Sequence, residues 1–253
     1  QGLVGEVTQE NGGNGNHDRS EVRVVTFDLD NTLWKTSKVI SAADDALATY
    51  LESCDISTPK RVGVIMRELF ESNKLKYAPQ NPDATFAVLL TLLRKDAIRE
   101  VLQQYNSYGE EEAEAFSEQA FEVWTQARHD AIPSHFAKSV LPSLQTIRDM
   151  KTSDGHAIVV GAITDGNSDP RNVTDLLPYF DFCINSESVG TSKPDKQVYL
   201  AAIHQFSFQP AVQKIFENIQ HWDDEQIMDN NIIGPWWVHI GDDFIKDIVA
   251  AKE

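Results

Sequence analysis

The feature that most restricts the fold of this chain is a short apolar run that ends in two aspartates. Val22, Val24 and Val25 indicate a buried strand, and Asp28 and Asp30 follow it directly. Side chains two residues apart at a strand end point to the same face. Two adjacent carboxylates repel each other unless a cation or a shared proton relieves them. The pair therefore predicts a divalent metal, and a reaction on phosphate in which one aspartate attacks and the other moves a proton.

The periodicity of apolar residues changes twice after this strand. Helical spacing predicts helices at residues 41–54, 61–73, 82–104 and 110–130, and a further helix at 139–150. From there on, apolar strands at 156–163, 182–185 and 236–240 alternate with helices at 169–177 and 194–206. Such alternation predicts an α/β fold with a parallel sheet and right-handed crossovers.

The helical residues lie between the first strand and the rest of the predicted sheet, which indicates an inserted domain. We expect a disordered, Gly- and Asn-rich tail at residues 1–20. We expect a discontinuous core made of residues 21–34 and 141–253, and an all-α domain at residues 35–140. Lys74, Lys76 and Tyr77 lie in a polar break of that domain and are candidate substrate contacts, although a solvated loop is the simpler interpretation.

Composition excludes several classes of partner. The net charge of −17 argues against binding to nucleic acid or to an anionic membrane, because both require clustered Lys and Arg. No run reaches the roughly 18 apolar residues of a membrane span. The two cysteines, Cys54 and Cys183, are far apart and lack metal-site spacing, which is typical of reduced thiols in an intracellular protein. We expect a soluble protein of the cytoplasm, or of the plastid stroma if a transit peptide has been removed.

Three further polar clusters follow predicted strands or open predicted helices. Residues 164–167 (Thr-Asp-Gly-Asn) offer a hydroxyl and backbone N–H groups to a phosphate oxygen, and Lys193 precedes Pro194 at a helix start. Residues 241–247 are rich in aspartate and can complete a hard-cation site. Each cluster alone could be a turn, a helix cap or a solvated lysine. Together they indicate one site, because ligands of parallel sheets bind beyond the carboxyl ends of the strands.

Four stretches, at residues 27–32, 163–167, 192–195 and 241–247, resemble the motifs of the haloacid dehalogenase (HAD) superfamily of hydrolases. The resemblance covers the chain from about residue 21 to its end. It implies a Rossmann-like parallel-sheet core with a helical cap of the C1 type inserted after the first motif. That arrangement is the one predicted from periodicity.

The resemblance also implies roles for individual residues. Asp28 would be the nucleophile that forms an aspartyl-phosphate, and Asp30 the general acid and then the base. Mg²⁺ would be held by the Asp28 carboxylate, the Asp30 backbone carbonyl and Asp242. The remaining expected site residues are Thr164 and Lys193 on the phosphoryl oxygens, Asn31 and Asp165 beside them, and Asp243 and Asp247 in an outer or additional ligand role. Asp165 stands where many relatives have Asn, so its charge would have to point away from phosphate.

Asp30 distinguishes reactions within the family. Dehalogenating members lack an acid at this place, because halide leaves without a proton. We therefore expect an Mg²⁺-dependent phosphatase that acts on a small phosphorylated metabolite. Residues 178–182, 186–190 and 239–243 are similar to flavin-pathway members, namely 5-amino-6-(5-phosphoribitylamino)uracil phosphatases and plant FMN hydrolases. A phosphomutase of the same family and a non-catalytic subunit of a larger assembly are the alternatives.

Two features depart from the family pattern. Residues 208–235 form a longer connection than usual before the last motif, which we interpret as a surface excursion or as a docking site for a protein partner through residues 208–237. The chain stops at residues 250–253, inside the last predicted helix, where the family continues with at least one more strand.

Overall fold

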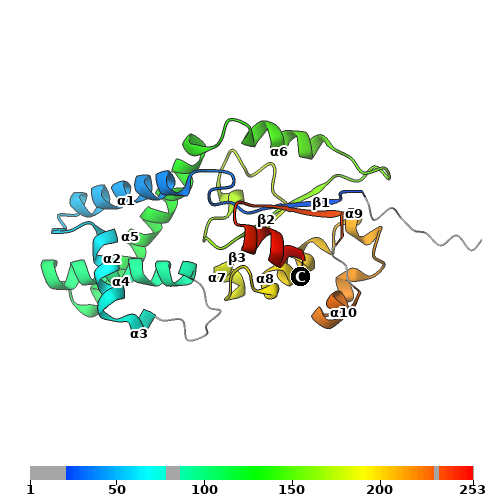
Figure 1. Cartoon of the computed structure of the whole chain (residues 1–253). Coiled ribbons are helices and arrows are strands. Elements are labelled where there is room, and N and C mark those ends of the chain that lie inside the picture. Colours follow the sequence, from blue (N-terminus) through cyan, green and yellow to red (C-terminus); the bar gives the residue numbers. More distant parts are fainter. Residues whose placement is uncertain (1–20, 78–85, 231–233, 253) are drawn as a thin grey trace, which may run out of the picture.

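The core of the molecule is a parallel sheet. The computed structural model describes residues 21–77, 86–230 and 234–252, and the tail at residues 1–20 lies outside them. The strands are β1 (Val24–Phe27), β2 (Val159–Thr164), β3 (Phe182–Asn185) and β4 (Trp237–Ile240). They pair in the order β3-β2-β1-β4, all in parallel (Figure 1). The predicted parallel α/β fold is confirmed.

Both faces of the sheet are buried. Two successive residues of β1 show this, because successive side chains of a strand point to opposite faces. Val24 belongs to a cluster with helix α8 (Lys196–Phe206), and the next residue, Val25, belongs to a second cluster with Leu144 of helix α6 (Val140–Asp149). Figure 1 shows α6 on one face and α8 on the other. Strands buried on both faces need continuous apolar runs, which explains why β2 was recognisable in the sequence.

Helices α1 to α5 form a separate body, which we call the helical block. They are α1 (Thr36–Ser53), α2 (Val62–Ser72), α3 (Lys74–Tyr77), α4 (Phe86–Asn106) and α5 (Glu110–Ala131). The block has its own buried cluster, which includes Leu47, Leu51, Ile98, Leu102 and Trp124. Its helices lie close to the predicted ranges, but α1 begins at Thr36 instead of residue 41. Residues 82–85 of the predicted third helix lie outside the described residues.

The chain enters and leaves the helical block at adjacent points, which we call the neck. The ring centroids of Trp34 and Phe136 are 6.4 Å apart, and the two residues form an isolated antiparallel bridge. The Ala137 N–H donates to the Leu33 carbonyl at 3.4 Å. The block is therefore an insertion between β1 and α6 whose two ends meet at the edge of the core.

The predicted helix at residues 169–177 is wrong. Only a short 3₁₀ turn, η2 (Pro170–Asn172), forms, and turns follow it. Tertiary packing is the physical reason, because contacts with the core can override a local helical preference. Val173 and Leu176 are still buried, so the segment packs on the core as a coil.

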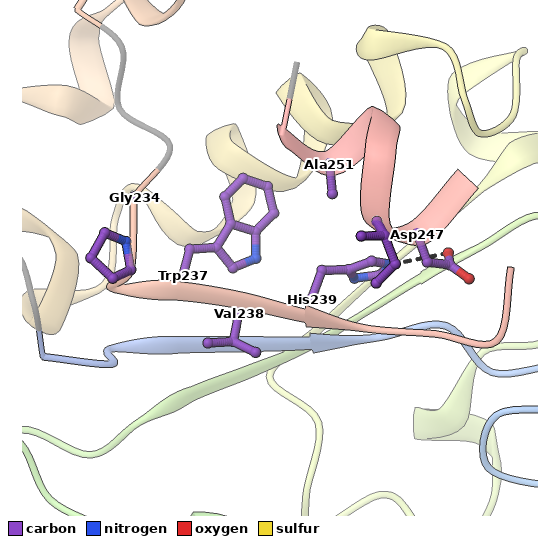
Figure 2. A pocket seen from close by; sticks show the side chains of 8 residues that line it. Gly234, Trp237, Val238, His239, Asp247 and Ala251 are labelled. Atoms are coloured by element: carbon purple, nitrogen blue, oxygen red, sulfur yellow. Dashed lines mark hydrogen bonds and ion pairs between the residues drawn. The ribbon is translucent and has the colours of Figure 1, made fainter. Parts of the chain in front are cut away.

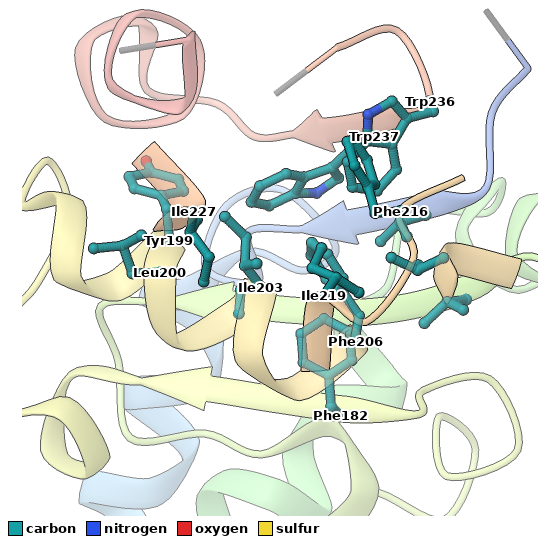
Figure 3. Packing of buried hydrophobic residues seen from close by; sticks show 14 of the residues in the cluster. Phe182, Tyr199, Leu200, Ile203, Phe206, Phe216, Ile219, Ile227, Trp236 and Trp237 are labelled. Atoms are coloured by element: carbon teal, nitrogen blue, oxygen red, sulfur yellow. The ribbon is translucent and has the colours of Figure 1, made fainter. Parts of the chain in front are cut away.

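The interpretation of residues 208–235 as a surface excursion is also wrong. Most of this segment is described, and it contains α9 (Pro210–Gln213), η3 (Ile219–His221) and α10 (Asp224–Asp229). Several of its apolar side chains are buried in one cluster with Trp236 and Trp237, as Figure 3 shows for Phe216, Ile219 and Ile227. The longer connection therefore extends the core below the sheet.

Strand β4 forms one edge of the sheet. Among the described residues no strand pairs with its outer side, and helical turns η4 (Phe244–Val249) and η5 (Ala250–Lys252) follow it. A cavity of about 460 Å³ borders this edge. Figure 2 shows that Trp237 and His239 face it, with the His239 ring bonded to Asp247.

Candidate active site

The polar clusters predicted from sequence meet at the carboxyl ends of the strands. They line a cavity of about 230 Å³, because the ends of parallel strands lie at one edge of the sheet. Its lining includes every expected site residue: Asp28, Asp30, Asn31, Thr164, Asp165, Lys193, Asp242, Asp243 and Asp247. Gly166 and Lys246 complete it.

A buried charge cluster lies at the centre of the site. Lys193 Nζ donates to Asp28 Oδ1 at 2.8 Å and to Asp247 Oδ1 at 2.6 Å. Burial alone would lower the pKa of Lys193, but the two carboxylates outweigh it and raise that pKa above its usual value. Lys193 is therefore a fixed cation whose charge is shared between Asp28, which follows β1, and Asp247 in η4.

The two carboxylates of this cluster respond differently to burial. Burial raises the pKa of Asp28 to about 6, against the opposing effect of Lys193. Asp247 is also buried, but hydrogen bonds from His239 and Lys193 hold its pKa well below its usual range. Asp28 is thus the carboxylate that a further positive charge would stabilise most.

Three carboxylates converge on one point of the cavity. Oxygen atoms of Asp28, Asp242 and Asp247 all lie within 4.8 Å of one another. Thr32 Oγ1 joins two of them, at 3.1 Å from Asp28 Oδ2 and 3.5 Å from Asp242 Oδ1. An all-oxygen set with excess negative charge suits a hard divalent cation such as Mg²⁺. Asp247, which the sequence placed in an outer or additional ligand role, belongs to this group, whereas the Asp30 side chain lies outside it.

The Asp30 carboxylate is held by donors from two parts of the chain. Oδ1 accepts from Trp34 Nε1 and Thr36 Oγ1, both at 3.0 Å. Arg128 Nη2, from the end of α5, lies 3.2 Å from Oδ1 and 3.0 Å from Oδ2. Sequence reasoning missed Arg128. The available signal was its register, because it follows Trp124 by four residues on the buried face of α5.

The loop after β2 places a hydroxyl and a glycine in the cavity. Thr164 Oγ1 is buried and accepts from the Gly166 N–H at 3.2 Å. A β-carbon on Gly166 would lie 2.6 Å from Asp30 Oδ2, so any other residue here would displace that carboxylate. The Asp165 carboxylate is neutralised within the protein: it accepts from the Lys193 N–H at 2.9 Å and from Lys246 Nζ at 2.7 Å. These two bonds tie the Asp165 carboxylate to the loop that carries Lys193 and to Lys246.

The remaining candidates differ in their surroundings. Asp243 caps η4 by accepting from the N–H groups of Ile245 and Lys246, both at 3.0 Å. Asn31 is exposed, with a positive φ of 66° in the loop after Asp30.

The candidate substrate contacts of the helical block lie elsewhere. Lys76 and Tyr77 bond to Asp96 at 2.7 and 2.6 Å, and Lys74 pairs with Glu71. None of the three candidates lines the cavity that holds Asp28.

Comparison with known proteins decides the family. The family model of the haloacid dehalogenase-like hydrolases matches residues 22–212. The chain belongs to this family. A search of curated proteins found no match. The match ends before residues 241–247, but the structure places Asp242 and Asp247 beside Asp28, so this HAD-like hydrolase also assembles the last acidic cluster.

Solved structures agree with this HAD-like fold. A 2-haloacid dehalogenase from Pseudomonas syringae pv. Tomato DC3000 has a TM-score of 0.60 and 24% identity, covering 91% of this chain and 82% of that one. The HAD-hydrolase YfnB from Bacillus subtilis, bound to magnesium, has a TM-score of 0.50 and 12% identity, covering 92% and 85%. Within the described parts of this HAD-like hydrolase, no helix has the length and apolarity to cross a membrane.

Proposed function

We propose that this HAD-like hydrolase is an Mg²⁺-dependent phosphatase that cleaves a small-molecule phosphate monoester through an aspartyl-phosphate. The observation that carries the proposal is the pairing of two carboxylates with different surroundings in one cavity. Asp28 is buried on Lys193, whereas Asp30 is held by neutral donors and Arg128 at the cavity wall. Such a division suits a nucleophile and a proton carrier.

The proposed reaction has two steps. A carboxylate oxygen of Asp28 attacks phosphorus, the bond from phosphorus to the ester oxygen breaks, and Asp30 gives its proton to the departing oxygen. Water then attacks the aspartyl-phosphate while Asp30 takes a proton from it, and the bond from phosphorus to Asp28 breaks. Lys193 and Thr164 bind the phosphoryl oxygens throughout, because the reaction depends on positioning and on neutralising charge.

The carboxylates of Asp28, Asp242 and Asp247 would hold Mg²⁺. When bound, the ion would supply positive charge to the phosphoryl oxygens. Lys193 alone cannot balance these three carboxylates, with which it shares the cavity. The excess of acidic groups over cations supports a bound divalent metal.

Asp30 supports ester hydrolysis over dehalogenation, although a dehalogenase is among the proteins with a similar fold. An alkoxide leaving group needs a proton, and halide does not. Three donors orient the Asp30 carboxylate at the wall of the cavity that holds Asp28. A dehalogenase would have no use for this arrangement.

We propose that the helical block is the cap that covers the site. Two contacts join it to the core near the cavity: Arg128 bonds to Asp30, and Thr91 of α4 donates to Glu187 of α7 (Ser186–Val189) at 2.9 Å. A closed cap excludes water from the reacting phosphate. FMN and 5-amino-6-(5-phosphoribitylamino)uracil are the proposed substrates, on the similarity of residues 178–182, 186–190 and 239–243.

The test is phosphate release by the wild type and Asp28→Asn, with Mg²⁺ and with EDTA. The substrates are FMN, the ribitylaminouracil phosphate and a set of sugar phosphates. Asp45→Asn, on the exposed surface of α1, is the control and should match the wild type. We expect activity only with Mg²⁺ and only when Asp28 is present.

Several outcomes would contradict the proposal. Activity that survives in Asp28→Asn would refute the nucleophile. Chloride release from 2-chloropropionate without phosphate release from any ester would show a dehalogenase. Equal turnover of the flavin precursors and of generic sugar phosphates would refute the flavin-pathway substrate while leaving the phosphatase intact. Conversion of one sugar phosphate into its isomer would identify a phosphomutase.

A further inference from the structure

We infer that Arg128 is a positioning residue that fixes the Asp30 carboxylate so that Oδ2 is the oxygen that exchanges the proton. This inference rests on the proposed function, in which Asp30 is the acid and base. It assigns a role to a residue of the helical block that belongs to none of the four sequence motifs.

Arg128 is a buried arginine at the boundary between the block and the core. Only 3% of its surface is exposed, and its guanidinium lies 5.8 Å from the centre of the Trp124 ring. Nη2 bonds to both oxygens of Asp30, and Nη1 bonds to Asn167 Oδ1 in the loop after β2. One rigid fork therefore joins α5 to the loops that follow β1 and β2.

The two oxygens of Asp30 are not equivalent. Oδ1 accepts from Trp34, Thr36 and Arg128, which uses its lone pairs. Within the described residues, Oδ2 accepts only from Arg128. Oδ2 is also the oxygen that a β-carbon on Gly166 would approach to 2.6 Å, so it lies beside Gly166 in the loop after β2. Oδ2 thus keeps a free position on the side where an ester oxygen would lie.

The geometry favours positioning over direct contact with substrate. Arg128 does not line the cavity, and Nη1 and Nη2 are both engaged by side chains. Its Nε is buried without a partner, so it cannot reach a ligand in the cavity. Loss of Arg128 would free the carboxylate to rotate about bonds that Trp34 and Thr36 hold only through Oδ1.

The experiment compares two esters that differ in their need for an acid. p-Nitrophenolate leaves without a proton, whereas an alkoxide requires one, so we compare p-nitrophenyl phosphate with the alkyl phosphate that the wild type cleaves fastest. The measured quantity is kcat/KM, which covers the steps up to cleavage of the ester bond and excludes later hydrolysis of the aspartyl-phosphate. For Arg128→Gln we expect a loss of about 10- to 100-fold on the alkyl ester, a part of the acid contribution. On p-nitrophenyl phosphate we expect a loss below about threefold.

Three further variants make the result specific. Arg128→Lys keeps the charge without the fork and should fall between the wild type and Arg128→Gln. Arg148→Gln removes a matched pair with Asp181, at 2.8 and 3.0 Å, remote from the cavity, and should change neither ester. In Asp30→Asn the further change Arg128→Gln should cost nothing on the alkyl ester, because the group that Arg128 positions is gone.

Each other result overturns the inference. Equal losses on both esters in Arg128→Gln and Arg128→Lys would show a structural role. A rise in KM on both esters with unchanged kcat would show a substrate contact. Additive losses in the Asp30→Asn background would show that Arg128 acts through another group. A wild type that cleaves neither ester would remove the proposed function itself, which separates that failure from a failure of Arg128.

Discussion

Lys193 Nζ lies 2.8 Å from Asp28 Oδ1, and both groups are buried. Removing one partner of a buried ion pair leaves an uncompensated charge, which costs about 3–5 kcal/mol. We therefore expect Lys193→Met to lose activity and about that much free energy of unfolding in urea denaturation. The control is Lys38→Met, at an exposed position of α1. A loss under about 1 kcal/mol would mean that Asp28 and Asp247 are not ionised together beside Lys193.

Gly166 should be required for activity. The β-carbon of Gly166→Ala would lie 2.6 Å from Asp30 Oδ2 and 3.2 Å from Arg128 Nη2, so the carboxylate must move. A displacement near 1 Å at a reacting group costs about 10²-fold, which we expect in kcat.

A second glycine gives the matched control for that measurement. A β-carbon added to Gly63 in α2 would have no neighbouring atom within 4 Å. Gly63→Ala should leave kcat unchanged and add about 0.4–1 kcal/mol to the free energy of unfolding, because alanine restricts the unfolded chain. If Gly166→Ala kept the wild-type kcat, the added methyl group would not displace the Asp30 carboxylate from its working position, and the prediction would be wrong.

Mg²⁺ should raise the thermal stability of the folded protein. A ligand at 100 times its Kd adds about 2.7 kcal/mol to the free energy of unfolding. Asp242 is exposed, so Asp242→Asn should fold normally but lose most of the Mg²⁺-dependent rise in Tm. Differential scanning calorimetry with Mg²⁺ and with EDTA measures both, and Asp45→Asn should keep the full rise. An equal rise in all three proteins would place the metal elsewhere.

Acid should weaken the fold at the start of β1. Hydrogen bonds from Thr152 and Arg23 lower the pKa of Asp154 to about 2. The unfolded chain has an Asp pKa of about 3.9, so the stabilisation is complete above that pH and is lost as the pH falls towards 2. Asp154→Asn should be less stable than the wild type at pH 5, and the difference should shrink by pH 2.5. Urea midpoints measure it, with exposed Asp175→Asn as the control. A constant difference would refute the linkage.

The strands and the site could be predicted from the sequence because one physical constraint serves both. A strand buried on both faces must be apolar, so its end is marked where Asp28, Thr164 or Asp242 begins a polar loop. Parallel strands then bring those ends together without further information. Lys193 needed no strand, because it stands with Pro194 just before helix α8, which begins at Lys196.

Arg128 could not be predicted in the same way. Arg128 and Asp30 are separated in the sequence by the whole helical block. The sequence of α5 does not reveal which loop of the core the end of the helix will contact. The helix predicted at residues 169–177 is wrong for a related reason. Val173 and Leu176 have helical spacing, but packing on the sheet decides the conformation in which they are buried. The apolar residues of 208–235 were visible, but their place beneath Trp236 depends on tertiary contacts.

The neck at Trp34 and Phe136 has a consequence for how such enzymes diversify. Both ends of the insertion meet at the neck. The distance between the points where the chain leaves and re-enters the core is therefore short, whatever residues are inserted between them. The block can be lengthened, rebuilt or swapped for an unrelated fold without moving the strand ends. A replacement would keep Asp28 and the loop after β2, but it would have to bring its own donor to the Asp30 carboxylate that Arg128 now holds.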